Sequence, residues 1–259
     1  MDGLDAIFRW LHIFAGIMWI GHLYFFNFVN GPLQGKLEAG TKKAVNPELL
    51  PRALYWFRWG AAWTWITGVL LLLIVYYHGG LLLNEGVSWG TGPIVMVVLT
   101  FLSPFVYDAL WSSGLADNRR AAVIVSFLLL AVVVALFVYF GQFSYRGTLI
   151  HTGTLFGTIM AFNVWFRIWP YQQKIIRAGK AGETPDAKLV KVAGVRSRHN
   201  TYMSVPLVWA MMGQHTTFFA GGNLGIPGEY YWIFWLLVII VGWHIVFQCY
   251  KKASKVGGF

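Results

Sequence analysis

The chain has 259 residues, a net charge of +10, and a composition that is 57% hydrophobic and only 12% charged, with a mean hydropathy of +0.57. This composition excludes an ordinary soluble domain and predicts an all-α polytopic membrane protein, with one membrane domain over residues 1–259. The basic residues fall between apolar runs, where orientation in a membrane explains them, so nucleic acid is not expected as a partner.

The first apolar run, residues 10–30, is long enough to cross a bilayer and carries His12 and His22. Helical geometry separates the two imidazoles by about 15 Å along the axis and leaves them on one side of the helix. Gly16 and Gly21 beside them would admit a flat cofactor or another helix. The alternative is a pair of histidines that only bond to neighbouring helices.

Seven apolar runs have a length close to the roughly 20 residues that a bilayer requires. They are residues 5–28, 54–77, 93–113, 120–141, 148–169, 200–219 and 230–249. Lys and Arg are alternately frequent and scarce in successive loops, with Arg146 alone between the fourth and fifth runs. This alternation predicts a bundle of about seven transmembrane helices, with the N-terminus outside and the C-terminus in the cytoplasm, as in a bacterial inner membrane.

A basic segment at about 170–199 is predicted to be a cytoplasmic loop of this single domain. It contains short helical patterning and a break from Gly182 to Pro185. We expect it to lie in solvent or on the membrane surface, where basic residues meet anionic lipid. Docking of a partner protein is the alternative.

Four histidines form two pairs at matching depth under this orientation. His12 and His215 fall in the outer half of the membrane, and His22 and His244 fall in the inner half. Two imidazoles on facing helices can hold haem b, and stacked haems carry electrons across a membrane. The pattern predicts one or two haem b groups. Zinc is disfavoured because its structural sites usually use cysteine thiolates, and Cys249 is the only cysteine.

Two further histidines, His78 and His151, lie at or close to the predicted outer surface and are not expected to be ligands. Three charged residues, Arg58, Asp108 and Arg167, lie inside predicted spans, where a charge needs a counter-charge or a polar cavity. One interpretation pairs Arg58 with Asp108. The other lets the arginines, Arg167 above all, bind a haem propionate or a planar anionic substrate.

The run WLHIFAGIMWIGHLYFFNFVN at residues 10–30, the tryptophan-rich span from Arg58 to Gly68, the stretch SRHNTYMSVPL from Ser197 to Leu207, and WHIVF near the C-terminus resemble the membrane domain of bacterial membrane-bound urate oxidases. The resemblance covers nearly the whole chain. It implies oxidation of urate to 5-hydroxyisourate, with electrons passed to a cytochrome.

A C-terminal cytochrome c domain typically follows this membrane domain in the family. A chain with one cysteine holds no CxxCH sequence, so we expect a separate cytochrome c or another respiratory partner to accept the electrons. The alternative is a non-catalytic, haem-binding or structural subunit of a larger respiratory or photosynthetic complex. A transporter would require a broken helix, for which only Ser103 and Pro104 offer a place. The residues leave the catalytic side chain unassigned.

Overall fold

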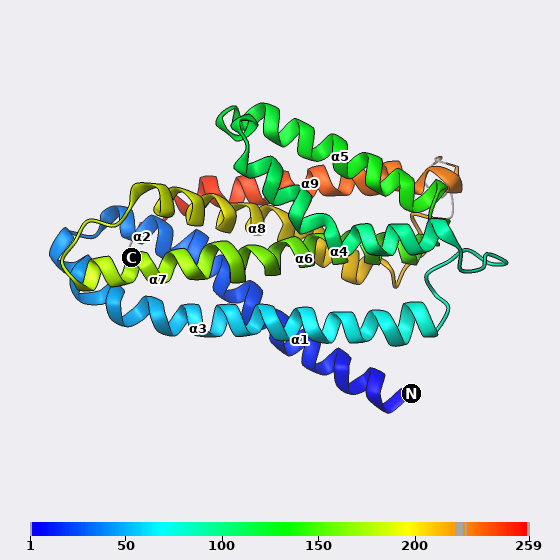
Figure 1. Cartoon of the computed structure of the whole chain (residues 1–259), viewed down its shortest axis with the longest axis horizontal. Coiled ribbons are helices and arrows are strands. Elements are labelled where there is room, and N and C mark those ends of the chain that lie inside the picture. The colour runs from blue at the N-terminus through cyan, green and yellow to red at the C-terminus, as the bar shows by residue number, and fades with distance from the viewer. Residues whose placement is uncertain (1, 221–224, 226, 258–259) are drawn as a thin grey trace. The chain divides into compact units, whose positions relative to one another are not determined.

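A computed structural model describes residues 2–220, 225 and 227–257 of the chain, drawn as ribbons in Figure 1. Within these residues the protein is all-helical and has no β-strand. The α-helices are α1 (Asp2–Tyr24), α2 (Gly31–Lys36), α3 (Ala39–Leu71), α4 (Thr91–Ser112), α5 (Arg119–Tyr139), α6 (Tyr145–Phe162), α7 (Trp169–Lys180), α8 (Ala187–Gly213) and α9 (Tyr231–Ala253).

Three π-helical turns continue these helices without a break. They are η1 (Phe25–Asn30), η2 (Leu72–His78) and η4 (Asn163–Ile168), and there are also two short 3₁₀ turns, η3 (Gly114–Asp117) and η5 (Gly228–Tyr230). A π turn inserts one residue into the helical repeat, shifts the hydrogen-bond register and often marks a functional segment.

Six helical segments of the described chain are long and apolar enough to cross a membrane, which makes this a multi-pass membrane protein. They are Gly3–Lys36, Ala39–His78, Thr91–Ser112, Arg119–Tyr139, Tyr145–Lys180 and Gly228–Ala253. The exception among the predicted runs is 200–219, which falls on α8. Its residues Asn200, Thr201 and Ser204 are fully buried. These polar side chains lower the mean hydropathy of α8, and they lie against protein.

Two segments predicted to lie between spans are largely helical. Helix α3 begins at Ala39 and contains Pro47 and Pro51. Proline costs a helix one backbone hydrogen bond but has a helical φ angle, and the ion pair between Glu48 and Arg52 supports this turn at 2.7 Å. The segment 170–199 is helical except for residues 181–186. Between the last two predicted spans, residues 221–224 and 226 lie outside the described residues.

The helices divide into two compact units, each described here by itself. Unit 1 comprises Met1–Leu70, Met160–Val205 and Gly242–Phe259, and unit 2 comprises Leu71–Ile159 and Pro206–Val241. The single membrane domain over residues 1–259 stays a prediction.

In unit 1, α1 packs closely against α3 through Gly60. A β-carbon at Gly60 would lie 3.0 Å from the backbone nitrogen of Trp19 and 3.3 Å from the carbonyl oxygen of Ala15. Close approach through a small residue is how membrane helices gain contact where lipid is as apolar as the side chains. Trp19 and Phe57 are almost completely buried. This contact holds the face of α1 that carries His12 against α3.

In unit 2, helices α4 and α5 are joined by the short turn η3 (Figure 1). The Asn118 side chain begins α5 by accepting a hydrogen bond from the backbone of Ala121 at 3.2 Å. Helix α4 runs through Pro104 without a break, and the Ser103 hydroxyl donates to the Thr100 carbonyl at 2.8 Å. The broken helix that a transporter requires is therefore absent at this position. The buried core of this unit consists of Leu72, Tyr76, Leu82, Met96, Phe137, Phe143 and Ile150.

The orientation in the membrane can be tested by cysteine labelling in intact cells. Both Ala181 and Glu85 are exposed, so a cysteine at either position is sterically accessible once Cys249 is replaced by serine. Because the positive-inside rule places the segment after α7 in the cytoplasm, an impermeant thiol reagent should label Glu85→Cys and miss Ala181→Cys. Permeabilised cells provide the control, in which both should react. Labelling of Ala181→Cys alone in intact cells would reverse the topology.

Candidate functional site

His12 of α1 is partly buried against α3 of the same unit. Its Nδ1 atom lies 3.2 Å from the Thr67 hydroxyl oxygen. That hydroxyl donates its own hydrogen to the Trp63 carbonyl at 2.6 Å, so it accepts from His12, and Nδ1 is assigned the ring proton. The Nε2 atom of His12 then carries the lone pair, and the ring also forms a hydrogen bond with the backbone of Thr64.

Gly68 leaves the space that the His12 ring occupies. A β-carbon at Gly68 would lie 3.0 Å from Cε1 and 3.4 Å from Nδ1 of His12. A larger residue here would displace the imidazole. The sequence had pointed to Gly16 and Gly21 instead. Gly16 faces the Thr64 methyl group at 3.8 Å, and the space beside Gly21 is open.

His22 lies one turn before the π turn η1, and its Nε2 atom is also unprotonated. Its Nδ1 lies 2.7 Å from the Met18 carbonyl oxygen of its own helix. A carbonyl only accepts hydrogen bonds, so Nδ1 is protonated and Nε2 carries the lone pair. Both predicted ligands on α1 thus have the tautomer that metal-bound histidines adopt when a second group holds their other nitrogen.

His244 belongs to unit 1 and is exposed on α9. Its Nε2 lies 3.0 Å from the amide nitrogen of Gln248, which donates to it. Coordination through Nε2 would require this amide to rotate away. The pairing of His244 with His22 stays a prediction.

His215 lies outside any helix, contrary to its predicted place in a span. Helix α8 ends at Gly213, and His215 follows in an exposed turn in which its backbone nitrogen bonds to the Met212 carbonyl at 3.1 Å. Glycine is a common residue at helix ends because its backbone can leave the helix at little cost. The pairing of His215 with His12 stays a prediction.

His151 is fully buried in unit 2. Its Nδ1 lies 3.0 Å from the Gly147 carbonyl, and its Nε2 lies 2.9 Å from the Tyr77 hydroxyl. Both ring nitrogens are therefore engaged by protein atoms. This geometry favours a packing role over ligation.

Arg58 lies in an aromatic cage. Its guanidinium carbon is 4.0 Å from the centroid of the Trp169 ring and between 5.7 and 5.8 Å from those of Tyr55, Trp59 and Trp165. Aromatic faces attract a cation, and a desolvated contact is worth about 2 kcal/mol. The tryptophans thus provide electrostatic compensation for Arg58 within unit 1. Asp108 belongs to unit 2.

Arg167 lies within the π turn η4 and is partly exposed. Its Nη1 donates to the Phe166 carbonyl at 3.2 Å, and its guanidinium carbon is 5.8 Å from the Phe162 ring centroid. Its aromatic contact is looser than the stack of Arg58 on Trp169.

A buried polar network that the sequence did not reveal connects the two π turns of unit 1 to α8. Asn27 in η1 donates to the Leu23 carbonyl and to the Ser197 hydroxyl, both at 2.9 Å. Asn200 in α8 donates to the Met160 carbonyl at 2.9 Å. A π turn leaves a carbonyl without its helical donor, and in both places a side-chain amide bonds to a carbonyl just before the turn.

The same network includes Asn163, whose amide donates to the Asn200 side chain at 2.9 Å, and Tyr250, whose hydroxyl donates to Asn27 at 2.8 Å. Arg196, one turn before Asn200 on α8, is only 2% exposed. The signal for this network was the SRHN sequence together with single asparagines inside apolar runs, because polar side chains there need partners.

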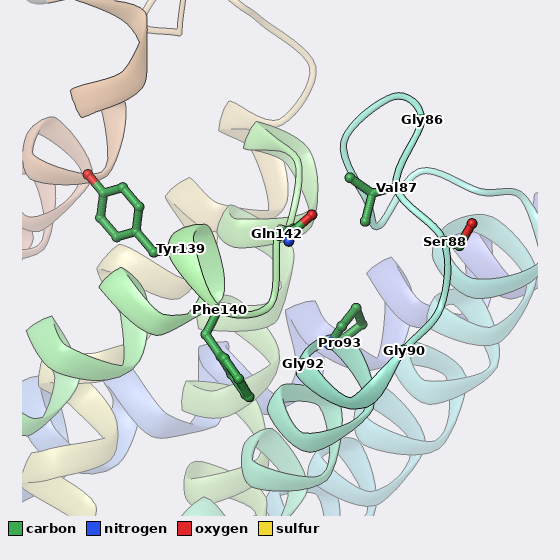
Figure 2. Close-up of a pocket in the computed structure, with 9 residues that line it drawn as sticks. All are labelled: Gly86, Val87, Ser88, Gly90, Gly92, Pro93, Tyr139, Phe140 and Gln142. Atoms are coloured by element: carbon green, nitrogen blue, oxygen red, sulfur yellow. The ribbon is translucent and has the colours of Figure 1, made fainter.

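Two surface hollows lie apart from the predicted ligands. The first, in unit 2, is lined by Gly86, Val87, Ser88, Gly90, Gly92, Pro93, Tyr139, Phe140 and Gln142, and the Tyr139 ring points away from Val87 and Ser88 (Figure 2). None of these nine residues is charged. The second, in unit 1, is lined by Pro47, Glu48, Pro51, Arg52, Tyr55, Trp56 and Lys180. Because neither hollow contains a predicted ligand, the candidate site is defined by the ring nitrogens of His12 and His22 on α1.

No group of three or more His, Cys, Asp or Glu side chains suited to a metal ion occurs in the part of the chain that is described. A haem iron takes at most two ligands from the protein, so this finding does not test the predicted histidine pairs.

The chain matches the protein-family model described as urate oxidase N-terminal over residues 34–256. This range includes Arg58, Arg167, His215 and His244, but it begins after both histidines of α1. Searches of curated proteins and of solved structures found no match.

Proposed function

The chain belongs to the urate oxidase N-terminal family, and on this premise we propose that it oxidises urate to 5-hydroxyisourate in the bacterial inner membrane. The electrons pass through haem b to a separate cytochrome or respiratory partner. The family match over residues 34–256 is the observation that supports urate oxidation. The tautomers of the α1 histidines support the haem.

The donor atoms of α1 fit haem b. His12 and His22 each offer a bare Nε2 while an oxygen atom holds the protonated Nδ1. Haem, when bound, supplies one-electron steps to a partner. The proposed second ligands are His215 and His244.

The conversion of urate to 5-hydroxyisourate adds one water molecule and releases two electrons and two protons. Urate is a planar anion, and the planar guanidinium of Arg167 can hold it through charge-assisted hydrogen bonds. Arg58 is the second candidate, but it already stacks on Trp169. A histidine is proposed to take the proton.

Steady-state oxidation of urate by the purified 259-residue chain tests this function. Turnover should require an added one-electron acceptor, because the chain contains no CxxCH sequence. Arg167→Ala should remove a charge-assisted contact worth about 1.5 to 3 kcal/mol, so the urate concentration for half-maximal rate should rise roughly 10- to 150-fold. The matched control is Arg146→Ala, which removes an exposed arginine of unit 2.

Haem content separates the two proposed roles of Arg167. If it holds urate, Arg167→Ala should bind as much haem as the unaltered chain. A variant that loses haem would assign Arg167 to a propionate instead. Equal urate dependence in both arginine variants would remove Arg167 from the substrate site.

The second candidate function is a non-catalytic subunit of a larger electron-transfer complex. The exposed apolar face of α5 favours it, since Ile124, Leu128 and Val132 are each more than half exposed. Lipid would cover this face in an enzyme, and a partner helix would cover it in a complex. Such a subunit would bind haem and leave urate unchanged.

A further inference from the structure

The hollow lined by Arg52 and Lys180 lies in unit 1, where α3 meets the end of α7. It has a volume of about 530 Å³, and its walls include Tyr55 and Trp56 of α3 as well as Lys180, the last residue of α7. Small-molecule sites usually have between about 300 and 1,000 Å³, so this hollow is large enough for the polar head of a lipid. Two segments that are far apart in the chain supply its cations.

The charges of this hollow do not balance. Glu48 is the one acid among the lining residues, against Arg52 and Lys180, so the lining has a net charge of +1. The Arg52 Nη1 atom donates to the Glu48 carboxylate at 2.7 Å, but the two side chains are 71% and 68% exposed, so water screens the pair. Arginine has five N–H groups, and both hydrogen bonds from Arg52 to Glu48 use Nη1. The Nε and Nη2 atoms of Arg52 therefore remain as donors for an anion.

The hollow lies at the boundary of an apolar segment. From residue 53 to residue 77 the only Lys, Arg, Asp or Glu is Arg58, whereas residues 36–52 contain six of them. Tyr55 and Trp56 fall at this change of composition, are each about half exposed, and pack edge to face with their ring centroids 5.3 Å apart. Tyrosine and tryptophan are enriched where a membrane meets water, because each ring is apolar and has one polar atom. The hollow is therefore at the depth of the lipid headgroups.

We propose that this hollow is a binding site for an anionic phospholipid, whose phosphate diester is held by Arg52 and Lys180. A phosphate diester has one negative charge, which equals the excess positive charge of the lining. A guanidinium group binds phosphate oxygens through paired hydrogen bonds, and a lysine acts on them as a point charge. Tyr55 and Trp56 contact the apolar carbon atoms next to the headgroup. The inference is independent of urate and of haem.

A site of this kind differs from the general attraction between a basic segment and an anionic membrane. General attraction depends on the number of charges near the surface, and it would treat Lys180 like Lys188, an exposed lysine of α8 in the same unit. A site requires the particular side chains that line the hollow. A soluble phosphate ion would use the two cations and gain nothing from Tyr55 and Trp56.

Native mass spectrometry of the full chain in detergent micelles measures the affinity of the first lipid that binds. Phosphatidylglycerol, which has a net charge of about −1 from its phosphate diester, should bind more tightly than phosphatidylcholine with the same acyl chains. Each basic residue near a membrane surface strengthens binding about fivefold. Arg52→Gln combined with Lys180→Gln should therefore weaken phosphatidylglycerol binding roughly 30-fold. The matched control, Lys188→Gln combined with Lys191→Gln, removes the same charge from α8 and should bind both lipids as the unaltered chain does.

Two further arms complete the test. Lys180→Gln alone preserves the ion pair between Arg52 and Glu48 and should weaken phosphatidylglycerol binding about fivefold. Inorganic phosphate at millimolar concentration should not displace phosphatidylglycerol, because it has no apolar part for Tyr55 and Trp56 to contact. Equal phosphatidylglycerol affinity in the two double variants would overturn the inference, as would equal binding of the two lipids by the unaltered chain. Displacement by inorganic phosphate would assign the hollow to a free anion and also reject the lipid site.

Discussion

Replacing His12 with alanine should remove about one equivalent of low-spin haem b per chain from the purified protein. The expected loss is complete because His22, the other histidine of α1, lies about 15 Å further along the helix and cannot replace the Nε2 lone pair of His12. Gly68 leaves the space that the His12 ring occupies beside α3. Pyridine haemochrome analysis measures the haem content, and the visible spectrum shows which low-spin component is lost.

The other predicted ligands divide into the same two groups. His215→Ala should lose the component that His12→Ala loses, and His22→Ala and His244→Ala should both lose the other. His78→Ala is the control, since His78 is exposed at the end of its helix. Unchanged spectra in all four ligand variants would reject the pairing. Less than about a tenth of a haem per unaltered chain would reject haem ligation itself.

Replacing Asn200 with leucine should destabilise unit 1 by about 1 to 3 kcal/mol. The side chain is fully buried, donates to the Met160 carbonyl and accepts from Asn163. A buried polar group that loses its partner costs about 1 to 3 kcal/mol. Reversible unfolding in mixed micelles gives the free-energy difference.

The control for this variant is Asn84→Leu, which makes a similar change at an exposed position of unit 2. It should unfold within about 0.5 kcal/mol of the unaltered chain. Equal stability of Asn200→Leu and Asn84→Leu would mean that the network around the π turns contributes no stability.

The membrane-crossing helices could be predicted because hydropathy averages over about 20 residues and tolerates local exceptions. One predicted run, 200–219, lies on α8, which ends at Gly213 and is not among the six segments that are apolar enough to cross a membrane. Its residues Asn200 and Thr201 are polar and buried in protein. The early start of α3 was missed because Pro47 and Pro51 are typical of helix ends.

The candidate site could be predicted only to the level of residue type and depth. His12 and His22 are recognisable as histidines inside an apolar run, but the roles of Thr67 and Gly68 depend on the contact between α1 and α3. A π turn does not change the hydropathy, so the hydrogen bond from Asn200 to the Met160 carbonyl, just before η4, could not be predicted either. The aromatic cage of Arg58 involves Trp169, over a hundred residues away in the chain, and sequence separation conceals such a contact.

The most direct test of the central claim is anaerobic mixing of the haem-loaded chain with urate, followed by stopped-flow absorbance in the Soret region. Urate alone should reduce the haem and then stop, because these 259 residues contain no CxxCH sequence that could hold a covalent haem to take the electrons further. An added one-electron acceptor should reoxidise the haem and restore turnover. A chain that binds haem yet shows no reduction by millimolar urate, with or without the acceptor, would contradict urate oxidation and leave the subunit of a larger complex as its function.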